Sequence, residues 1–192
     1  MSREYKKRKR AESEAQTKLR ITEATMNLHE TVGPARTTVS AIADAAGVQR
    51  ATVYRHFPDE DALIEACSSH WATLHPGPDP TPWLELADPD ERLRAAVSGF
   101  YDFYAETGET LEKLIRDAPR VPAIAIRMQA LSEMLDHLAD LLMEGRGLRG
   151  AKRKRVRAAI GHALRLETWR SLVRDQGLSN DEAVDLVVKL AA

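Results

Sequence analysis

The segment TTVSAIADAAGVQRATVYRHF, residues 37–57, predicts two short helices joined by a tight turn. Apolar residues recur in its first half at the spacing of one helical face, namely Val39, Ile42, Ala43 and Ala46. Thr38 before them suits an N-cap, because its hydroxyl can accept from the free amides of the first turn. Gly47 ends this helix at a turn position that suits a left-handed backbone. A second helix follows from about residue 49 to residue 57. This is the sequence pattern of a helix-turn-helix.

The second helix has two faces when its residues are placed at 100° intervals. Val53 and Phe57 point toward the core. The opposite face is small at its start and then rich in hydrogen-bond donors, as a helix entering a DNA major groove requires. Arg side chains there can hold guanine O6 and N7, while Tyr, His and the preceding threonines suit phosphate oxygens. The candidate DNA contacts are Thr37, Thr38, Gln49, Arg50, Ala51, Thr52, Tyr54, Arg55 and His56.

The charge of the chain is divided unevenly. The 192 residues carry a net charge of −1, with 43% hydrophobic and 30% charged residues, typical of a soluble globular protein. Residues 1–58 hold 11 Lys and Arg against 6 Asp and Glu, whereas the rest of the chain is acidic. A basic front end indicates that this part meets a polyanion. The single cysteine, the lack of a secretory signal and the lack of a long apolar run predict a cytoplasmic protein without a membrane partner.

The rest of the chain also reads as helix, and no segment predicts a strand. Residues 1–12 form a basic, charge-rich arm, and four prolines with a glycine mark a linker within residues 75–88. The expected helices are 14–32, 59–74, 88–106, 109–117, 122–144, 151–175 and 180–191, besides the two of the motif. The predicted fold class is therefore all-α, with a three-helix DNA-binding domain at 1–58 and a helical domain at 59–192.

The N-terminal third resembles the TetR family of bacterial transcriptional regulators. The residues that carry the resemblance are Arg20-Ile21, Ala24, Leu28, Gly33, Thr37-Thr38-Val39, Ile42-Ala43, Ala46-Gly47-Val48, Tyr54, Phe57 and Leu63. The chain departs from the family pattern at Gln49, where Ser is common, and at His29 and Pro34, where aromatic residues are common. It also carries Asp59-Glu60-Asp61 where a phosphate-facing Lys is usual.

The resemblance implies a DNA-binding regulator, specifically a repressor that a small molecule releases from a double-stranded operator. We expect a homodimer through the last two helices, whose wide apolar surfaces need a partner, and a palindromic operator. The effector is unidentified, and no cofactor, metal site or enzymatic activity is expected. Two alternatives are a DNA-binding protein without an effector and a helical enzyme, although no catalytic motif supports the latter.

Two weaker patterns leave alternatives open, and two further features have one favoured interpretation. The first is a set of candidate effector contacts, which would equally serve as core: Phe100, Tyr101, Tyr104, Met128, His162 and Trp169. The basic run at 6–10 is either a DNA-binding arm or a solvated tail. A second basic run, 152–157, is interpreted as a solvated face, and Cys67 as a small buried hydrophobic residue.

Overall fold

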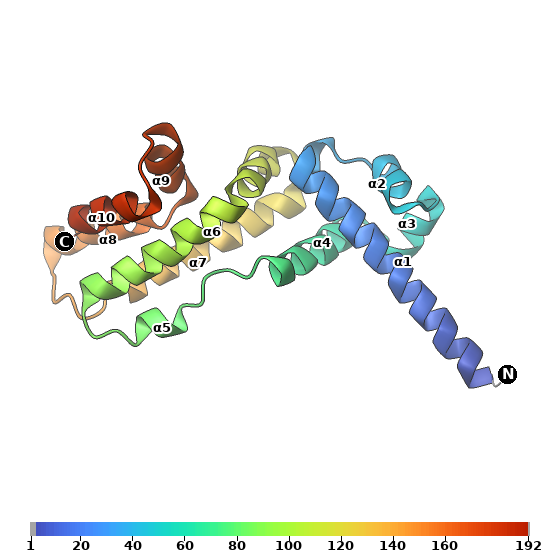
Figure 1. Cartoon of the computed structure of the whole chain (residues 1–192), viewed down its shortest axis with the longest axis horizontal. Helices are drawn as coiled ribbons and strands as arrows, with labels where there is room; N and C mark the ends of the chain where they lie inside the picture. Colours follow the sequence, from blue (N-terminus) through green and yellow to red (C-terminus); the bar gives the residue numbers. More distant parts are fainter. Residues whose placement is uncertain (1–2, 192) are drawn as a thin grey trace. The chain divides into compact units, whose positions relative to one another are not determined.

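The computed structural model describes residues 3–191, and within that range all regular structure is helical, which confirms the predicted all-α class (Figure 1). The chain forms two compact units. Within the described range, the first unit extends to Pro76 and also takes in Glu109–Arg127. The second unit comprises Gly77–Gly108 and the chain from Met128 onward.

The first unit contains the helix-turn-helix and the segments that support it. Its helices are α1 (Arg3–Thr31), the 3-10 turn η1 (Pro34–Arg36), α2 (Val39–Ala46), α3 (Arg50–His56) and α4 (Glu60–Leu74). The last turns of α6 (Pro89–Asp117), the 3-10 turn η2 (Ala118–Arg120) and the start of α7 (Pro122–Leu141) complete it. The long helix α1 packs against both α2 and α4.

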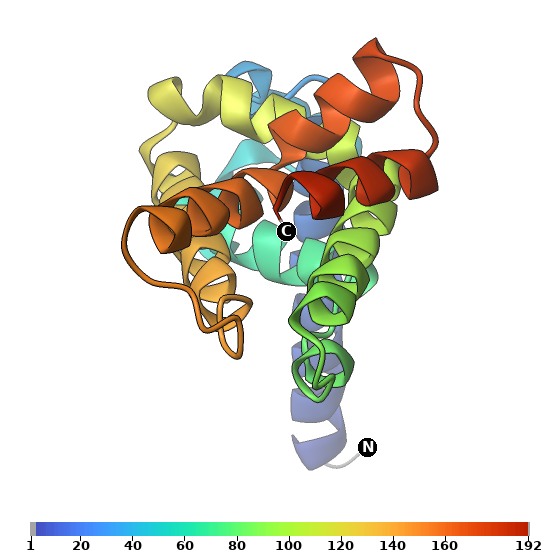
Figure 2. The same ribbon diagram turned by 90° about the vertical axis from the view of Figure 1, so that its left-hand side faces the viewer.

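The second unit contains the earlier part of α6, the rest of α7 and the C-terminal helices. These are α5 (Thr81–Leu84), α8 (Gly150–Ala163), α9 (Leu166–Trp169), the π-helical segment η3 (Arg170–Asp175) and α10 (Asn180–Leu190). The last helix lies against α8, as Figure 2 shows in red and orange. A capping box starts α10 as predicted, because the Ser179 hydroxyl accepts from the Glu182 amide and the Glu182 carboxylate accepts from the Ser179 amide.

The N-terminal helix begins earlier than the sequence analysis predicted. Residues 3–12 were assigned to an arm outside the helix, but α1 includes them; residues 1 and 2 lie outside the described range. The side chains of residues 4–12 are exposed, so local preferences decide their conformation. Lys, Arg, Glu and Ala all favour helix, and the pairs Arg8–Glu12 and Arg10–Glu14 add support one turn apart.

Two further helix predictions were wrong because tertiary packing overrode local signals. Residues 88–106 and 109–117 form one continuous helix, α6, through Gly108. A Cβ there would lie 2.9 Å from the Trp169 ring, so this glycine serves close packing within the second unit. The linker, in turn, contains the one-turn helix α5 with Pro82 in its first turn, where a missing amide costs nothing.

The predicted helix 151–175 is also interrupted. Helix α8 ends at Ala163, and the chain then turns before α9 and η3. At this break the Tyr104 hydroxyl donates to the Leu164 carbonyl at 2.8 Å, and the Thr168 hydroxyl donates to the His162 carbonyl at 2.5 Å. These hydroxyls supply donors to carbonyls at the end of α8, and the His162 carbonyl also accepts from the Arg165 amide at 3.1 Å.

A buried polar pair lies between α1 and α4 in the first unit. His29 and Cys67 are 8% and 4% exposed, and the His29 Nδ1 lies 3.7 Å from the Cys67 Sγ. Burial lowers the pKa of His29 to about 4, and nearby Asp117 opposes this shift. Burial also raises the pKa of the Cys67 thiol to about 12, so Cys67 behaves as the buried hydrophobic residue that the sequence predicted.

We therefore predict that the protein loses stability as the pH falls from about 6.5 to 4. In that window the unfolded chain protonates His29, whose ordinary pKa is 6.5, while the folded chain does not. The free energy of unfolding should fall by about 2 kcal/mol between about pH 7 and pH 5, measured by urea denaturation. His29→Phe should reduce this fall by the same amount. An identical pH dependence in wild type and variant would contradict the account.

Candidate nucleic-acid interface

The helix-turn-helix is built around a small apolar core within the first unit. Val53 and Phe57 of α3 are 1% and 3% exposed and pack in one cluster with Ile42 of α2, as predicted. Val39 packs against this cluster while remaining half-buried. The cluster also contains Ile21, Ala24, Ala43, Ala46 and Leu63. Helices α1, α2 and α4 thus fix the orientation of α3 by packing against its inner face.

The turn between α2 and α3 has the predicted geometry. Thr38 caps α2 by accepting from the Ala41 amide at 3.1 Å. Gly47 ends the helix in the left-handed region, with φ 64° and ψ 41°, where a side chain is disfavoured. Gln49 stands at the N-cap of α3 without a side-chain cap bond, in line with its being a poorer cap than Ser.

The outer face of α3 is exposed and chemically unengaged. Arg50, Ala51, Tyr54 and Arg55 are all exposed, and Thr52 is half-buried. No hydrogen bond or ion pair in residues 3–191 engages either guanidinium of Arg50 and Arg55. The helix therefore presents two free arginine side chains next to small residues, which is the chemistry that base-edge reading requires.

Three of the predicted contact residues are more constrained. The Thr37 hydroxyl donates to the Gly33 carbonyl at 2.9 Å, and the Thr38 hydroxyl already serves as a cap. His56 is half-buried, and its Nε2 is fully buried without a hydrogen-bond partner. In this conformation, a phosphate oxygen could be reached by His56 only through Nδ1.

Helix α4 begins with the acidic run that departs from the family pattern. The Asp59 carboxylate caps this helix by accepting from the Ala62 amide at 2.8 Å. Further along α4, the Glu65 carboxylate forms an ion pair with Arg127 of α7 and accepts a hydrogen bond from it. This hydrogen bond is the main reason that the pKa of Glu65 is lowered. The acidic side chains at the start of α4 thus stabilise the helix and supply no cation for a phosphate.

A tight corner between α1 and η1 holds the helix-turn-helix against the end of α6. The Asp117 carboxylate, 2% exposed, accepts from the Ala35 amide at 3.1 Å. Arg116 donates to both oxygens of Asp117, at 2.7 and 3.0 Å, and to the Val32 carbonyl at 3.2 Å. The hydrogen bonds from Arg116 are the main reason that the pKa of Asp117 lies below its usual range. At Gly33, with φ 91°, a Cβ would clash with both side chains.

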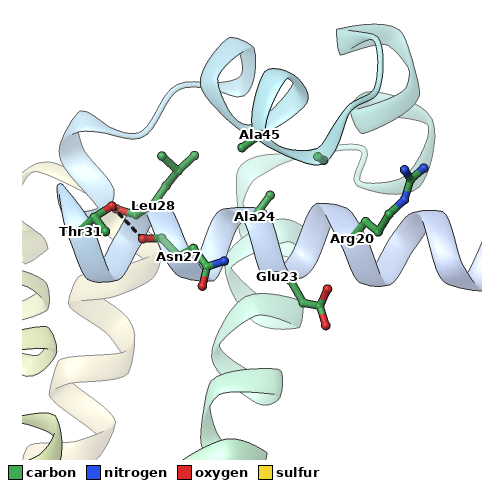
Figure 3. A pocket seen from close by; sticks show the side chains of 8 residues that line it. Arg20, Glu23, Ala24, Asn27, Leu28, Thr31 and Ala45 are labelled. Carbon is green, nitrogen blue, oxygen red and sulfur yellow. Dashed lines mark hydrogen bonds between the residues drawn. The ribbon is translucent and has the colours of Figure 1, made fainter.

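An open groove lies between α1 and α2 on the first unit (Figure 3). Its volume is about 320 Å³, and Arg20, Glu23, Asn27 and Thr31 contribute polar side chains to it. Arg20 and Glu23 bring opposite charges to the groove. The groove therefore differs from a phosphate-binding surface, in which cationic side chains dominate.

The candidate effector residues all belong to the second unit, but the structure does not bring them all together. Phe100, Tyr104 and Trp169 form a chain of rings with centroids 5.8 and 6.2 Å apart, and all three are buried. Tyr101 is fully buried as well. The remaining two candidates, Met128 and His162, are half-buried and exposed, respectively.

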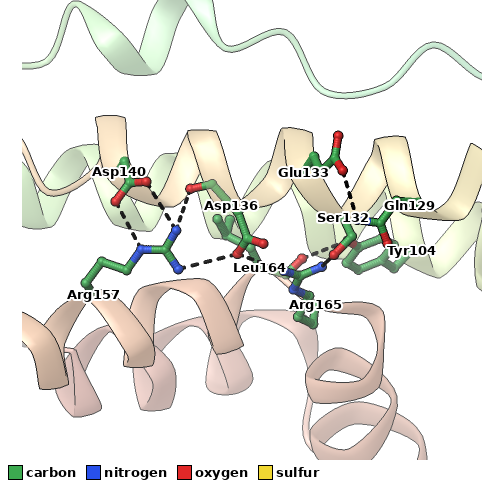
Figure 4. A network of polar contacts seen from close by, with 9 residues as sticks. All are labelled: Tyr104, Gln129, Ser132, Glu133, Asp136, Asp140, Arg157, Leu164 and Arg165. Carbon is green, nitrogen blue, oxygen red and sulfur yellow. Dashed lines mark hydrogen bonds and ion pairs between the residues drawn. The ribbon is translucent and has the colours of Figure 1, made fainter.

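A polar network joins α7 to the C-terminal helices of the second unit (Figure 4). Arg157 of α8 donates to the Asp140 carboxylate at 3.0 Å and to the Asp136 carbonyl at 2.8 Å. Arg165 bonds the Ser132 hydroxyl at 2.9 Å and the Asp136 carboxylate at 3.0 Å. One member of the second basic run is therefore used within the protein, while Lys152–Arg155 are exposed.

The apolar surface of the last helices is smaller than the sequence predicted. Four apolar residues of α10 are buried within the chain, namely Ala183, Val184, Val187 and Val188. Leu186 and Leu190 remain exposed, at 37% and 70%. Dimerisation through these helices stays a prediction, and within α10 the exposed apolar residues that could support it are Leu186 and Leu190.

A helix-turn-helix with an unengaged, donor-rich outer helix defines the first unit as a DNA-binding domain. Residues 21–67 match the family described as bacterial regulatory proteins, tetR family. The chain is 29% identical over 154 residues to the HTH-type transcriptional activator FasR of Mycolicibacterium smegmatis, covering 78% of this chain and 69% of that protein. The N-terminal segment thus matches the TetR family, and the chain is a DNA-binding transcriptional regulator.

Solved structures share the fold across most of the chain. AibR, determined with isovaleryl coenzyme A and operator DNA, has a TM-score of 0.61 and 19% identity, covering 91% of this chain and 97% of its own. FadR from Bacillus subtilis, determined with stearoyl-CoA, has a TM-score of 0.56 and 18% identity, covering 90% and 96%. In the described range, no helix has the length and apolar character to cross a membrane.

We predict that Asp117→Asn destabilises the first unit, because the neutral amide loses the charge-assisted bonds to Arg116 and weakens the one to the Ala35 amide. The free energy of unfolding should fall by about 1–3 kcal/mol, measured by urea denaturation at neutral pH. Glu106→Gln is the matched control, since it makes the same change at an exposed position of α6. Equal stability of the two variants would show that the corner contributes nothing.

Proposed function

We propose that the protein is a repressor that binds operator DNA through α3 and is released by an acyl thioester bound in its second domain. In this proposal residues 1–58 read DNA, and residues 59–192 bind the effector and dimerise. The observation that carries the DNA-reading role is the exposed face of α3, on which Arg50 and Arg55 have no partner in the described chain. Thr52 beside them, and Tyr54 and His56 at the flanks, supply further donors.

The effector class is supported by two structural neighbours and by the interior of the second unit. AibR and FadR were each determined with an acyl-CoA, although they are under 20% identical and share only the fold. The buried rings of Phe100, Tyr104 and Trp169 offer an apolar environment suited to an acyl chain. The effector can release DNA only to the extent that it prefers the conformation that does not bind DNA.

An activator is a second candidate, because the relative FasR is described as a transcriptional activator. Both candidates use the same helix-turn-helix, and they differ in where the operator lies and in how binding there changes transcription. Transcription in vitro from a promoter carrying the operator separates them: a repressor lowers transcript yield and an activator raises it. The proposal requires the yield to fall and an acyl-CoA to restore it.

We predict that Arg55→Ala weakens binding to operator DNA much more than binding to unrelated DNA. Losing a two-bond contact to guanine costs about 1–3 kcal/mol, or roughly 5- to 150-fold in affinity, at that base pair alone. Fluorescence anisotropy at near-physiological salt measures both affinities. Arg153→Ala, at an exposed position on α8, is the matched control and should change neither. Equal losses on both DNAs would assign Arg55 to phosphate contact and overturn its base-reading role.

We further predict that isovaleryl-CoA or stearoyl-CoA lowers the affinity for operator DNA by about 5- to 150-fold, the usual range of allosteric coupling. Free coenzyme A is the control, because it has the same charged nucleotide without the acyl group. Calorimetry on the protein alone checks that the acyl-CoA binds. Binding without any change in DNA affinity would favour the alternative of a regulator with no small-molecule control. Absence of binding would contradict the effector class.

A further inference from the structure

One buried hydroxyl in the second unit has no hydrogen-bond partner. Tyr101 lies on α6 with 0% of its surface exposed, and its Oη is buried and unpaired. A buried hydroxyl that makes no hydrogen bond lowers the stability of the folded protein, so such a group needs a physical explanation. Burial raises the pKa of Tyr101 above its ordinary value, which keeps the group a hydrogen-bond donor at neutral pH.

The neighbouring buried hydroxyls each donate a hydrogen bond to a backbone carbonyl. Tyr104, three residues later, donates to the Leu164 carbonyl at 2.8 Å. Thr107, one turn further along, donates to the Phe103 carbonyl at 2.6 Å. Thr168 on α9 donates to the His162 carbonyl at 2.5 Å. Among the buried hydroxyls of the second unit in the described chain, Tyr101 alone lacks an acceptor.

The charged side chains buried in this unit restrict which kind of hydrogen-bond acceptor a ligand could place beside the Tyr101 hydroxyl. Two charged side chains of this unit are buried in the described range: Arg146, which donates to the Asp90 carboxylate at 2.7 Å and to the Pro89 carbonyl at 2.8 Å, and Arg92. The Arg92 guanidinium already donates to the Leu86 carbonyl at 2.7 Å and to the Glu144 carbonyl at 3.1 Å. An ionised carboxylate placed beside Tyr101 would lose its hydration without meeting a free cation, which is strongly unfavourable. An uncharged carbonyl on an apolar molecule requires only the single donor that Tyr101 provides.

We propose that the Tyr101 hydroxyl donates a hydrogen bond to the uncharged ester or thioester carbonyl that adjoins the apolar acyl chain of an effector bound in the second unit. This inference rests on the proposed function and names the residue that recognises the polar group of the effector. Binding pairs the hydroxyl, so the complex recovers free energy that the free protein lacks. Pairing regulates DNA binding to the extent that the Tyr101 hydroxyl can reach the effector in only one of the two conformations of the protein.

Tyr101 also lies on the helix that reaches the DNA-binding unit. Helix α6 is continuous from Pro89 to Asp117, and its last residue holds the corner at Ala35. A change in the position of α6 that accompanies pairing of Tyr101 therefore has a covalent, helical route to the helix-turn-helix.

Two conservative variants test the proposal, because each removes only a hydroxyl. Tyr101→Phe removes the unpaired group, so it should raise the melting temperature by about 2–4 °C. Tyr104→Phe removes a paired group and leaves the Leu164 carbonyl without its donor, so it should lower the melting temperature. A lower melting temperature for Tyr101→Phe would show that the hydroxyl is already paired in the free protein, by water or otherwise, and would overturn the proposal.

Calorimetry then compares the ligands isovaleryl-CoA, stearoyl-CoA, methyl octanoate and octanoate ion on wild type and both variants. The proposal expects wild type to bind an uncharged carbonyl compound more tightly than octanoate, and Tyr101→Phe to weaken that binding about tenfold, equivalent to one hydrogen bond. Infrared spectra of the bound ligand labelled with carbon-13 at its carbonyl should show a shift to lower frequency that Tyr101→Phe abolishes and Tyr104→Phe retains.

The outcomes separate this inference from the proposed function. Acyl-CoA binding and release of operator that are unchanged in Tyr101→Phe would overturn the role of Tyr101 and leave the proposed function standing. Binding of methyl octanoate but of neither acyl-CoA, with loss in Tyr101→Phe, would support the role of Tyr101 and contradict the thioester class. A wild-type protein that binds none of the four compounds would overturn both.

Discussion

The buried carboxylate of Asp117 is the constraint on which the placement of the DNA-reading helices depends. It accepts from the Ala35 amide in the corner between α1 and α2, and Arg116 joins it to the Val32 carbonyl. These bonds fix the point at which the chain leaves α1, while the apolar cluster around Val53 and Phe57 fixes how α3 rests on the domain. Because Gly33 has no side chain, Arg116 and Asp117 can approach the backbone closely.

The same corner lies at the end of a helix that extends into the second unit. Asp117 ends α6, and the earlier turns of that helix carry the buried aromatic residues of the second unit. Arg127 of α7 forms an ion pair with Glu65 of α4. Helix α7, which like α6 belongs to both units, is therefore also bonded to α4 within the first unit. Under the proposed function, a movement of α4 would act on α7 through the Glu65–Arg127 ion pair.

The sequence predicted well those features that depend on local patterns. The cap at Thr38, the left-handed turn at Gly47 and the inward face of α3 follow from residues within one or two turns of each other. It predicted poorly where distant partners decide the structure. Gly108 looks like a helix end until Trp169 is seen to pack over it, and no pattern in a single sequence pairs Asp117 with a backbone amide 82 positions earlier. The unpaired hydroxyl of Tyr101 is likewise visible only once its surroundings are known.

The central claim, that α3 reads a DNA sequence, is tested most directly by selecting DNA from a random pool with the purified full-length protein at near-physiological salt. The account predicts enrichment of a sequence with two inverted half-sites whose centres are about one helical turn or a multiple of it apart. Recovery of no preferred sequence, with all binding lost as salt rises, would mean that the protein meets only phosphates and would contradict the claim.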